Sequence, residues 1–462
     1  MIADLKPYEE YRECQIEWMG ALPITWAVDR AKWILKKVDR PVRPDDEVVT
    51  CFRDGQVTLR KNRRTTGFTE ATAEVGYQGI RRGDLVIHQM DAFAGAVGIS
   101  DSDGKATPVY SVCVPTDNAV PAYYAALVRE MARKGWIEAL AKGIRERSTD
   151  FRFDTFKNLH VPIPPRSEQE AIVRFLVLSN RRIDRFVRSK RKLIALLEEQ
   201  KRAIISQAVT RGLDPDAPLK PSGIPWLGEV PSHWEVTRTK YLFREVDHRS
   251  ATGSEEQLSV SHLTGVTPRS QKNVTMFKAQ SYVGHKVCEP GDLVINTMWA
   301  WMAALGVAFE VGIVSPAYGV YRPLKGSFLN PEFADYMFRA EPYRRNYLAH
   351  STGIRASRLR LYPDKFLALS VALPGLDEQV AIVHELARRT SKARIAIEQA
   401  TREVKLIEEY RAQLTSDVVT GQLDVREAEV PDTQDGGTAL DELLGERMPE
   451  FEEELEFTEA EV

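Results

Sequence analysis

Two stretches of the chain carry apolar or long-stemmed residues at alternating steps of four and three, which is the period of a coiled-coil seam. The first runs from Ile183 to Ala208, and the second runs from Ile397 to Val418 on the same steps, offset by 210. A seam this narrow cannot bury itself alone, so we expect the two helices to pack along each other. Because the chain must return to begin its second half, antiparallel packing is expected. The expected packing positions are Val187, Ile194, Leu197, Ile204, Ile397, Val404, Ile407 and Leu414.

Each of these stretches follows a proline-containing phrase that predicts a helix start. In PPRSEQE, Ser167 is an expected cap, and Glu170 three residues later would complete a capping box. In the matching phrase LPGLDEQ, Asp377 is the expected cap.

The rest of the chain has a different pattern. Short β-branched runs such as DEVVTCFRDGQVTLR and GDLVIH are interrupted by Gly or Pro every eight to twelve residues. This pattern predicts mixed domains dominated by a curved antiparallel sheet, with short helices such as PAYYAALVREMARKG. The expected fold class is therefore α+β, with two similar domains separated by a pair of long helices packed as an antiparallel coiled coil.

The two halves are copies of one unit. IEWMGALPITWAVDRAKWILKKVDR from Ile16 recurs as IPWLGEVPSHWEVTRTKYLFREVDH from Ile224, with 10 of 25 positions identical, where about one or two would match by chance. GDLVI also recurs, from Gly83 and from Gly291. The expected boundaries are 1–160 for the first domain, 161–214 for the first spacer helix, 215–372 for the second domain, 373–426 for the second helix and 427–462 for a tail.

Composition narrows the class of protein. No stretch approaches the roughly eighteen apolar residues of a membrane span, and the start lacks the features of a signal peptide. We therefore expect a cytoplasmic protein with no membrane partner. The four cysteines are isolated, which favours structural thiols over a metal site.

Charge is unevenly distributed along the chain. Residues 427–462 hold fourteen acids against one base, so residues 1–426 carry 62 bases against 52 acids, a net charge of +10. A basic body favours polyanionic partners, because neutralised phosphates release condensed counterions. The acidic tail is expected to be disordered or to dock on a partner, and a solubilising extension explains it equally well.

Several phrases resemble the specificity subunit of type I restriction-modification systems. They are KPYEEYRECQIEWMGALPITW, GDLVI with MDAFAGAVGIS, SPAYGVYRP, STGIRASRLRLYPDKF, and PPRSEQEAIV with LPGLDEQVAIV. The resemblance covers residues 6 to about 426 and includes the order of the motifs and their duplication. It implies two target-recognition domains, a chain that performs no chemistry and binds no cofactor itself, and a complex with double-stranded DNA. It also implies two methyltransferase subunits that bind the helical spacer, and restriction subunits that translocate and cleave DNA. S-adenosylmethionine, ATP and Mg would then be used by those partners.

Two groups of basic residues are candidate DNA contacts. Arginine can grip guanine and asparagine adenine, whereas lysine mostly holds phosphate. The first group comprises Arg60, Lys61, Asn62, Arg63 and Arg64, with Arg269, Lys272 and Asn273 as approximate equivalents. The second group surrounds a repeated Gly-Ile-Arg element and comprises Arg145, Arg147, Arg355, Arg358 and Arg360. A solvated loop is the alternative for the first group, and a structural ion-pair role is the alternative for the second.

Two other functions stay open. Asn330-Pro331-Glu332-Phe333 is similar to the NPPF-type motif of DNA adenine methyltransferases, although a helix cap by Asn330 explains it equally. A duplicated protein-binding scaffold is the other alternative.

Residues 180–209 are expected to form a helix about 45 Å long. If the chain reads DNA, this helix is longer than one turn of the duplex, which is about 35 Å. The helix pair is therefore expected to set an unread gap between two half-sites.

Overall fold

The computed structural model describes residues 5–14, 16, 18–64, 74–140, 150–271, 281–353 and 359–428. These residues form short helices and strands in each half, together with two helices of 46 and 44 residues. The α-helices are α1 (Pro121–Arg133), α2 (Trp136–Leu140), α3 (Phe153–Phe156), α4 (Arg166–Arg211), α5 (Pro331–Arg339), α6 (Glu341–His350), α7 (Pro363–Ala368) and α8 (Leu376–Val419). The 3-10 helices are η1 (Ala31–Trp33), η2 (Arg60–Asn62), η3 (Ala92–Ala94), η4 (Thr239–Tyr241), η5 (Arg269–Gln271) and η6 (Ala300–Met302).

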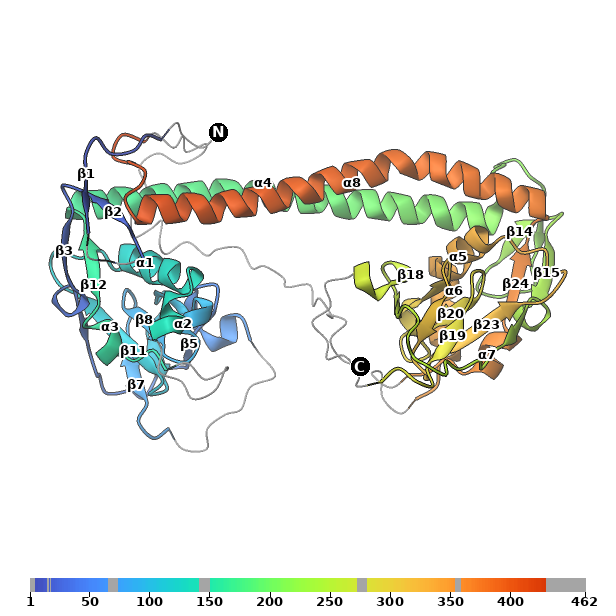
Figure 1. Cartoon of the computed structure of the whole chain (residues 1–462), viewed down its shortest axis with the longest axis horizontal. Helices are drawn as coiled ribbons and strands as arrows, with labels where there is room; N and C mark the ends of the chain where they lie inside the picture. Colours follow the sequence, from blue (N-terminus) through green and yellow to red (C-terminus); the bar gives the residue numbers. More distant parts are fainter. Residues whose placement is uncertain are drawn as a thin grey trace. The chain divides into compact units, whose positions relative to one another are not determined.

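The strands are short and occur at equivalent places in the two halves (Figure 1). In the first half they are β1 (Tyr11–Glu13), β2 (Ala21–Pro23), β3 (Ala27–Arg30), β4 (Leu35–Lys37), β5 (Val49–Cys51), β6 (Val57–Leu59), β7 (Gln78–Ile80), β8 (Leu85–His88), β9 (Val97–Ile99), β10 (Gly104–Ala106), β11 (Tyr110–Pro115) and β12 (His160–Ile163). In the second half they are β13 (Leu219–Pro221), β14 (Glu229–Pro231), β15 (Glu235–Arg238), β16 (Phe243–Glu245), β17 (Leu258–Ser261), β18 (Gly265–Pro268), β19 (Lys286–Cys288), β20 (Leu293–Ile295), β21 (Leu305–Val307), β22 (Gly312–Val314), β23 (Gly319–Pro323) and β24 (Ser370–Leu373).

Sheet topology is the same in both halves. A four-stranded antiparallel sheet has the order β4-β11-β8-β9 in the first half and β16-β23-β20-β21 in the second. Two-stranded antiparallel ribbons accompany each sheet, pairing β5 with β6, β7 with β10 and β3 with β12, and likewise β17 with β18, β19 with β22 and β15 with β24. The expected curved sheet is thus divided into a small sheet and ribbons, and the predicted α+β class with two similar domains is confirmed.

The repeated phrase GDLVI forms the turn and central strand of each sheet. Gly83 and Gly291 have φ of 90° and 93°, a left-handed conformation that glycine adopts without strain. Side chains of the following strand alternate between two cores, because successive residues of a strand point to opposite faces. Leu85 and Ile87 enter the core that contains α1, whereas Val86 enters the core beneath the β5–β6 ribbon. Both faces of the strand are buried, so its sequence is a continuous apolar run.

The chain divides into two compact units, and the division falls inside both long helices. One unit contains the described residues up to Ser189 and those from Glu403 to 428, and the other contains Lys190–Arg402. In the first unit, Ile183 and Val187 of α4 share a core with Leu414 of α8. In the second unit, the end of α4 shares a core with the start of α8. The side chains that meet there are Ala208, Val209, Ile382 and Leu386.

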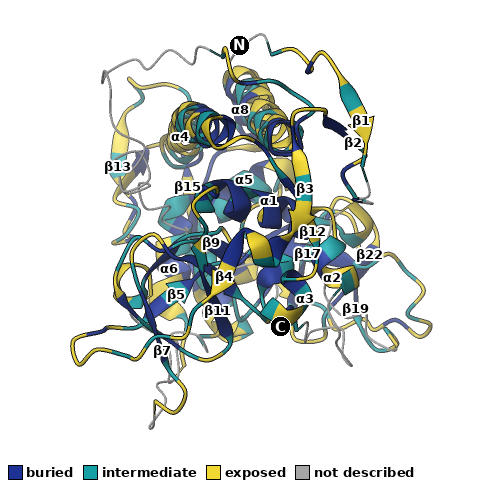
Figure 2. Ribbon diagram, turned by 90° about the vertical axis from the view of Figure 1, so that its left-hand side faces the viewer, coloured by how far each residue is buried: buried dark blue, intermediate teal, exposed yellow. Residues whose placement is uncertain are grey.

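Within each unit the start of one long helix therefore lies against the end of the other, as antiparallel packing requires. Both long helices carry buried, intermediate and exposed residues (Figure 2), and the residues predicted for the seam are among the buried and intermediate ones. Val187 and Leu414 are buried, and the other predicted packing residues are partly buried. These are Ile194, Leu197, Ile204, Ile397, Val404 and Ile407. Asp184 of α4 forms an ion pair with Arg411 of α8, so the charge of each is neutralised where the two helices meet.

The predicted capping residues lie inside the helices that they were expected to cap. Helix α4 begins at Arg166, so Ser167 is its second residue, and Glu170 accepts a hydrogen bond from Arg166 Nε at 3.1 Å. Helix α8 begins at Leu376, which places Asp377 in its first turn. The capping-box prediction is wrong, because both helices begin before the residues that were expected to cap them. Their starts are held instead by the tertiary hydrogen bonds described below.

Candidate nucleic-acid interface

A backbone hydrogen bond to a neighbouring segment fixes the first candidate loop. Helix η2 directly follows β6, and the Arg60 N–H donates to the Val48 carbonyl at 2.8 Å. Asn62 Nδ2 donates to Thr58 Oγ1 at 2.8 Å. Residues 61–64 are exposed and Arg60 is partly buried. The loop therefore holds a row of basic side chains on a fixed backbone.

Arg63 and Lys61 are paired with side chains of the segment that precedes the loop. Arg63 Nη1 donates to Asp54 Oδ2 at 2.5 Å, and its guanidinium lies 4.3 Å from the centre of the Phe52 ring. Lys61 forms an ion pair with Glu47, and both side chains are more than half exposed. An exposed ion pair contributes at most about 1 kcal/mol, so a phosphate can replace Glu47 at little cost. Arg63, by contrast, stabilises the hairpin.

The second candidate loop occupies the equivalent place. Helix η5 follows β18, and the Arg269 N–H donates to the Gln257 carbonyl at 2.8 Å, the counterpart of the Arg60 bond. Arg269 Nη1 also donates to Gln257 Oε1 at 2.9 Å. Arg269 therefore lies at the same place in its domain as Arg60 does in the first, and contact of Arg269 with DNA remains a prediction.

Several predicted contacts lie outside the described residues. They are Arg145, Arg147, Lys272, Asn273, Arg355 and Arg358. Arg360 is described and exposed, and its backbone exchanges two hydrogen bonds with Thr352, each of 3.0 Å. Its Nη2 lies 3.9 Å from Met298 Sδ. DNA contact by all of these arginines, lysines and asparagines remains a prediction.

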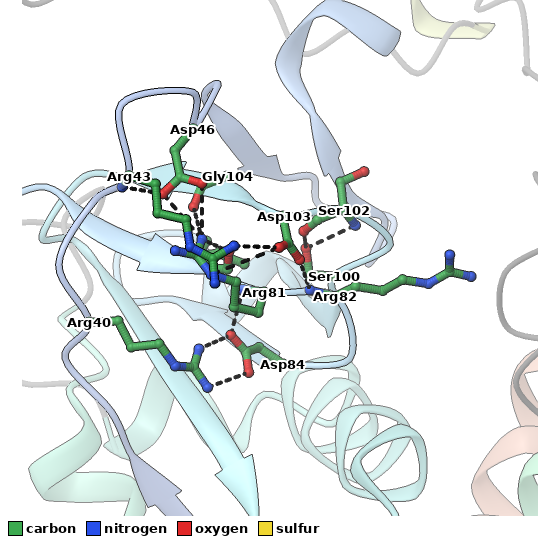
Figure 3. Close-up of polar contacts among 11 residues, drawn as sticks. Arg40, Arg43, Asp46, Arg81, Arg82, Asp84, Ser100, Ser102, Asp103 and Gly104 are labelled. Carbon is green, nitrogen blue, oxygen red and sulfur yellow. Dashed lines mark hydrogen bonds and ion pairs between the residues drawn. The ribbon is translucent and has the colours of Figure 1, made fainter.

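The first domain contains an arginine–aspartate network that sequence reasoning missed (Figure 3). Arg81 Nη1 donates to Asp46 Oδ1 at 3.0 Å, and both side chains are largely buried. The Arg82 N–H donates to Asp103 Oδ1 at 2.9 Å, and this bond is the largest cause of a lowered pKa of Asp103. The side chain of Arg82 points away from the network in Figure 3 and is exposed. Arg82 is therefore a further candidate for a phosphate contact, on a turn that the network keeps rigid.

The aspartate of each GDLVI phrase is neutralised by a different arginine. Asp84 accepts the Arg81 N–H at 2.7 Å and pairs with Arg40. Asp292 accepts the Glu289 N–H at 2.8 Å and two bonds of 2.9 Å from Arg322. Both carboxylates are buried, so each needs a cation. The position equivalent to Arg322 holds Val114, and the position equivalent to Arg40 holds His248.

Both long helices begin with a glutamate that accepts an indole hydrogen bond. Trp26 Nε1 donates to Glu168 Oε1 at 2.8 Å, and Trp234 Nε1 donates to Glu378 Oε1 at 3.1 Å. Both tryptophans are buried, and they occupy equivalent positions of the repeated phrase. A carboxylate in the first helical turn also interacts favourably with the helix dipole.

The next residue in each helix is a buried glutamine that joins three segments. Gln169 Oε1 accepts the Val120 N–H at 2.8 Å, while its Nε2 donates to the carbonyls of Asn118 at 3.1 Å and Pro164 at 2.8 Å. Gln379 repeats this pattern with Asn330, Phe328 and Pro374, at 2.8, 3.1 and 2.9 Å. The repeated Glu-Gln pair was the available signal in the sequence.

Asn330 is a helix cap. Its Oδ1 accepts the Phe333 N–H at 2.9 Å, and Pro331 is the first residue of α5. The side chain that an adenine methyltransferase would use to hold its target is thus engaged by its own helix, so the motif is explained by helix initiation.

Three of the four cysteines are buried. Burial raises the pKa of Cys51, Cys113 and Cys288 to about 12, which makes these thiols poor nucleophiles. Among the described residues, no group of three or more His, Cys, Asp or Glu side chains is placed to hold a metal ion. No helix in the described ranges is both long and apolar enough to cross a membrane.

The duplicated domains, the equivalent basic loops and the paired long helices define a protein of two similar domains and a helix pair, and its sequence is similar to those of two curated proteins. The chain is 24% identical over 291 residues to the type I restriction enzyme MjaVIII specificity subunit of Methanocaldococcus jannaschii, covering 59% of this chain and 64% of that protein. It is 25% identical over 322 residues to the putative type I restriction enzyme MjaX specificity subunit of the same organism, covering 68% of this chain and 70% of that protein.

A solved structure has the same fold. It comes from work on complex assembly and conformational transition of the type I R-M system, with a TM-score of 0.63, 16% identity, and coverage of 87% of this chain and 99% of that one. No protein-family model matches the chain. The homologues of this chain are type I restriction enzyme specificity subunits, which confirms the resemblance inferred from the repeated motifs.

Proposed function

We propose that this chain is the DNA-specificity subunit of a type I restriction-modification complex, in which each domain reads one half of a bipartite site. The observation that carries the proposal is the duplication of an anchored basic loop, η2 in one domain and η5 in the other. Two similar domains with equivalent loops fit two short DNA sequences read by one chain. The names of the relatives support this role.

The proposal assigns no reaction to this chain. Methyl transfer with S-adenosylmethionine belongs to two methyltransferase subunits, and ATP- and Mg-dependent translocation and cleavage belong to restriction subunits. The complex would act on double-stranded DNA in the cytoplasm. Separation of the two half-sites by the long helices remains the prediction made from helix length.

Neutralising the first loop tests DNA binding. Lys61→Ala combined with Arg64→Ala is expected to weaken DNA binding at least about tenfold at physiological salt. The slope of log affinity against log salt should fall by about 1 for each phosphate that the loop no longer neutralises. Fluorescence anisotropy measures both the affinity and the salt slope. The DNA probe carries the sequence motif that the assembled complex methylates. Lys405→Ala on α8 removes a comparably exposed cation and serves as the control. An unchanged salt slope in the loop variant would contradict the assignment.

Two measurements separate the alternatives. A self-contained adenine methyltransferase would transfer methyl groups from S-adenosylmethionine to DNA as the purified chain alone, whereas the proposed subunit would be inactive without its partners. A protein-binding scaffold would bind DNA weakly, with no difference between the motif and unrelated DNA.

A further inference from the structure

A glutamate from the segment before each two-stranded ribbon lies against the candidate DNA loop of its domain. Glu47 forms an ion pair with Lys61, and Glu256 Oε1 accepts the Ser270 N–H at 3.2 Å. Both glutamates are exposed. Lys61 and Ser270 occupy equivalent positions, so the carboxylate is common to the two domains whereas its partner differs. An acid beside a loop that is expected to hold DNA needs a reason, because a carboxylate repels phosphate.

The backbone of each glutamate is fixed in the same way. The Glu47 carbonyl accepts an N–H from β10, and the Glu256 carbonyl accepts an N–H from β22, both at 2.8 Å. A glycine lies against each of these carbonyls. A Cβ on Gly104 would lie 2.4 Å from the Glu47 oxygen, and a Cβ on Gly312 would lie 2.6 Å from the Glu256 oxygen. Both carboxylates therefore stand on a closely packed backbone, which reduces the entropy lost when they bind a partner.

The glutamate is common to two segments that otherwise differ in charge. Residues 47–61 align with residues 256–270 without a gap. The charged residues that both copies share there are the glutamate and the arginine that begins each 3-10 helix. The ion pair with Lys61 does not account for the shared acid, because Ser270 has no charge to neutralise. What both domains retain is a carboxylate beside an arginine-bearing loop.

A carboxylate can distinguish DNA sequences through the hydrogen bonds that it accepts. In the major groove every base pair presents one amino group, on cytosine or on adenine, from which a carboxylate can accept a hydrogen bond. Where no amino group is within reach, the carboxylate faces acceptors and phosphates and is repelled. Such a side chain favours one sequence without raising the affinity for all DNA. Two domains can share it and still read different sequences, since neighbouring side chains select the base.

Given the proposed function, on which this assignment rests, we infer that Glu47 and Glu256 are specificity-determining residues. Each accepts a hydrogen bond from the amino group of a cytosine or adenine in the half-site of its own domain. In the free protein Lys61 neutralises the carboxylate of Glu47. On DNA the lysine turns to a phosphate and releases the carboxylate to the base. The exchange costs little, because the ion pair is exposed.

Glu47→Gln tests the inference, because glutamine keeps the size and one acceptor oxygen but removes the charge. Binding of the assembled complex to an unrelated duplex is expected to tighten about fivefold, because a repulsion is lost. Binding to a duplex with the motif that the complex methylates should not tighten, because a neutral acceptor makes a weaker hydrogen bond than a charged one. The preference for the motif should therefore fall about fivefold. Fluorescence anisotropy with the two duplexes measures this preference.

Base-pair substitutions assign the effect to a half-site. When each base pair of the motif is exchanged in turn, one position of one half-site should cost the wild-type complex about tenfold in affinity. The same exchange should cost the Glu47→Gln complex less than about threefold. Glu256→Gln should show this loss of discrimination at a position of the other half-site, which a merely structural residue would not do. Glu235→Gln removes an exposed charge from β15 and is the control, for which the motif preference should be unchanged.

The other outcomes are distinguishable. Equal tightening for both duplexes would show that the glutamates act through net charge alone, which overturns the inference while the proposed function stands. Unaltered binding of the glutamine variants to both duplexes overturns it as well. If the wild-type complex does not prefer the motif to unrelated DNA, the proposed function fails and the inference fails with it.

Discussion

Gln169→Leu is expected to lower the free energy of unfolding of its unit by about 3 kcal/mol, because a buried backbone group without its partner costs about 1–3 kcal/mol. The substitution removes the hydrogen bonds to Val120, Asn118 and Pro164 in a site where Gln169 is fully buried. Leucine approximates the volume of glutamine but makes none of these bonds. Urea unfolding followed by circular dichroism measures the decrease.

Two further substitutions complete this experiment. Gln379→Leu should cost the second unit a similar amount, because its three hydrogen bonds are the same. Gln413→Leu makes the same chemical change at an exposed position of α8 and should alter stability by less than about 0.5 kcal/mol. Equal stability of the Gln169 and Gln413 variants would show that the buried glutamine does not hold the helix start.

Arg411→Ala is expected to destabilise the first unit by about 3 kcal/mol, because it leaves the buried carboxylate of Asp184 without its cation. The Asp184 side chain is only 3% exposed, so water substitutes poorly for the guanidinium. Combining Arg411→Met with Asp184→Leu removes both charges and should restore stability to within about 1 kcal/mol of wild type. Thermal or urea unfolding of the three proteins measures the difference. A double variant as unstable as Arg411→Ala would assign the effect to packing.

The long helices were predictable because their signal is periodic and local. Each residue predicted for the seam is buried or partly buried, including Val187 and Leu414. Antiparallel packing followed from chain connectivity, and duplication of the domains followed from matching phrases. Asn330 was predictable as a cap because the Asn-Pro pattern of a helix start is also local.

The tertiary hydrogen bonds that hold the helix starts were not predictable in the same way. Ser167 and Asp377 fit capping rules, yet each helix begins one residue earlier, at Arg166 and Leu376. In the first turns Glu168 and Glu378 accept hydrogen bonds from tryptophans more than a hundred residues away in the sequence. A local rule cannot weigh such distant partners. The division of the sheet into a four-stranded core and ribbons likewise depends on pairings between strands far apart in the sequence.

Basic residues in the candidate loops illustrate a different limit. The five residues from Arg60 to Arg64 are similar in sequence, but Arg63 is engaged by Asp54 and Phe52. Lys61 keeps an exposed and replaceable partner. Charge identifies such a loop, whereas the roles of individual side chains depend on neighbours that the linear sequence does not show.

The buried aspartates of the two GDLVI phrases have a consequence for how such domains diverge. Asp84 takes its cation from Arg40 and Asp292 takes it from Arg322, on different segments. A change from one arrangement to the other through a form with both arginines never leaves the buried carboxylate without a cation, whereas a form with neither would be costly. In an alignment of related domains, those that lack an arginine at the position of Arg40 should therefore carry one at the position of Arg322. This covariation would assign each domain to one of two lineages.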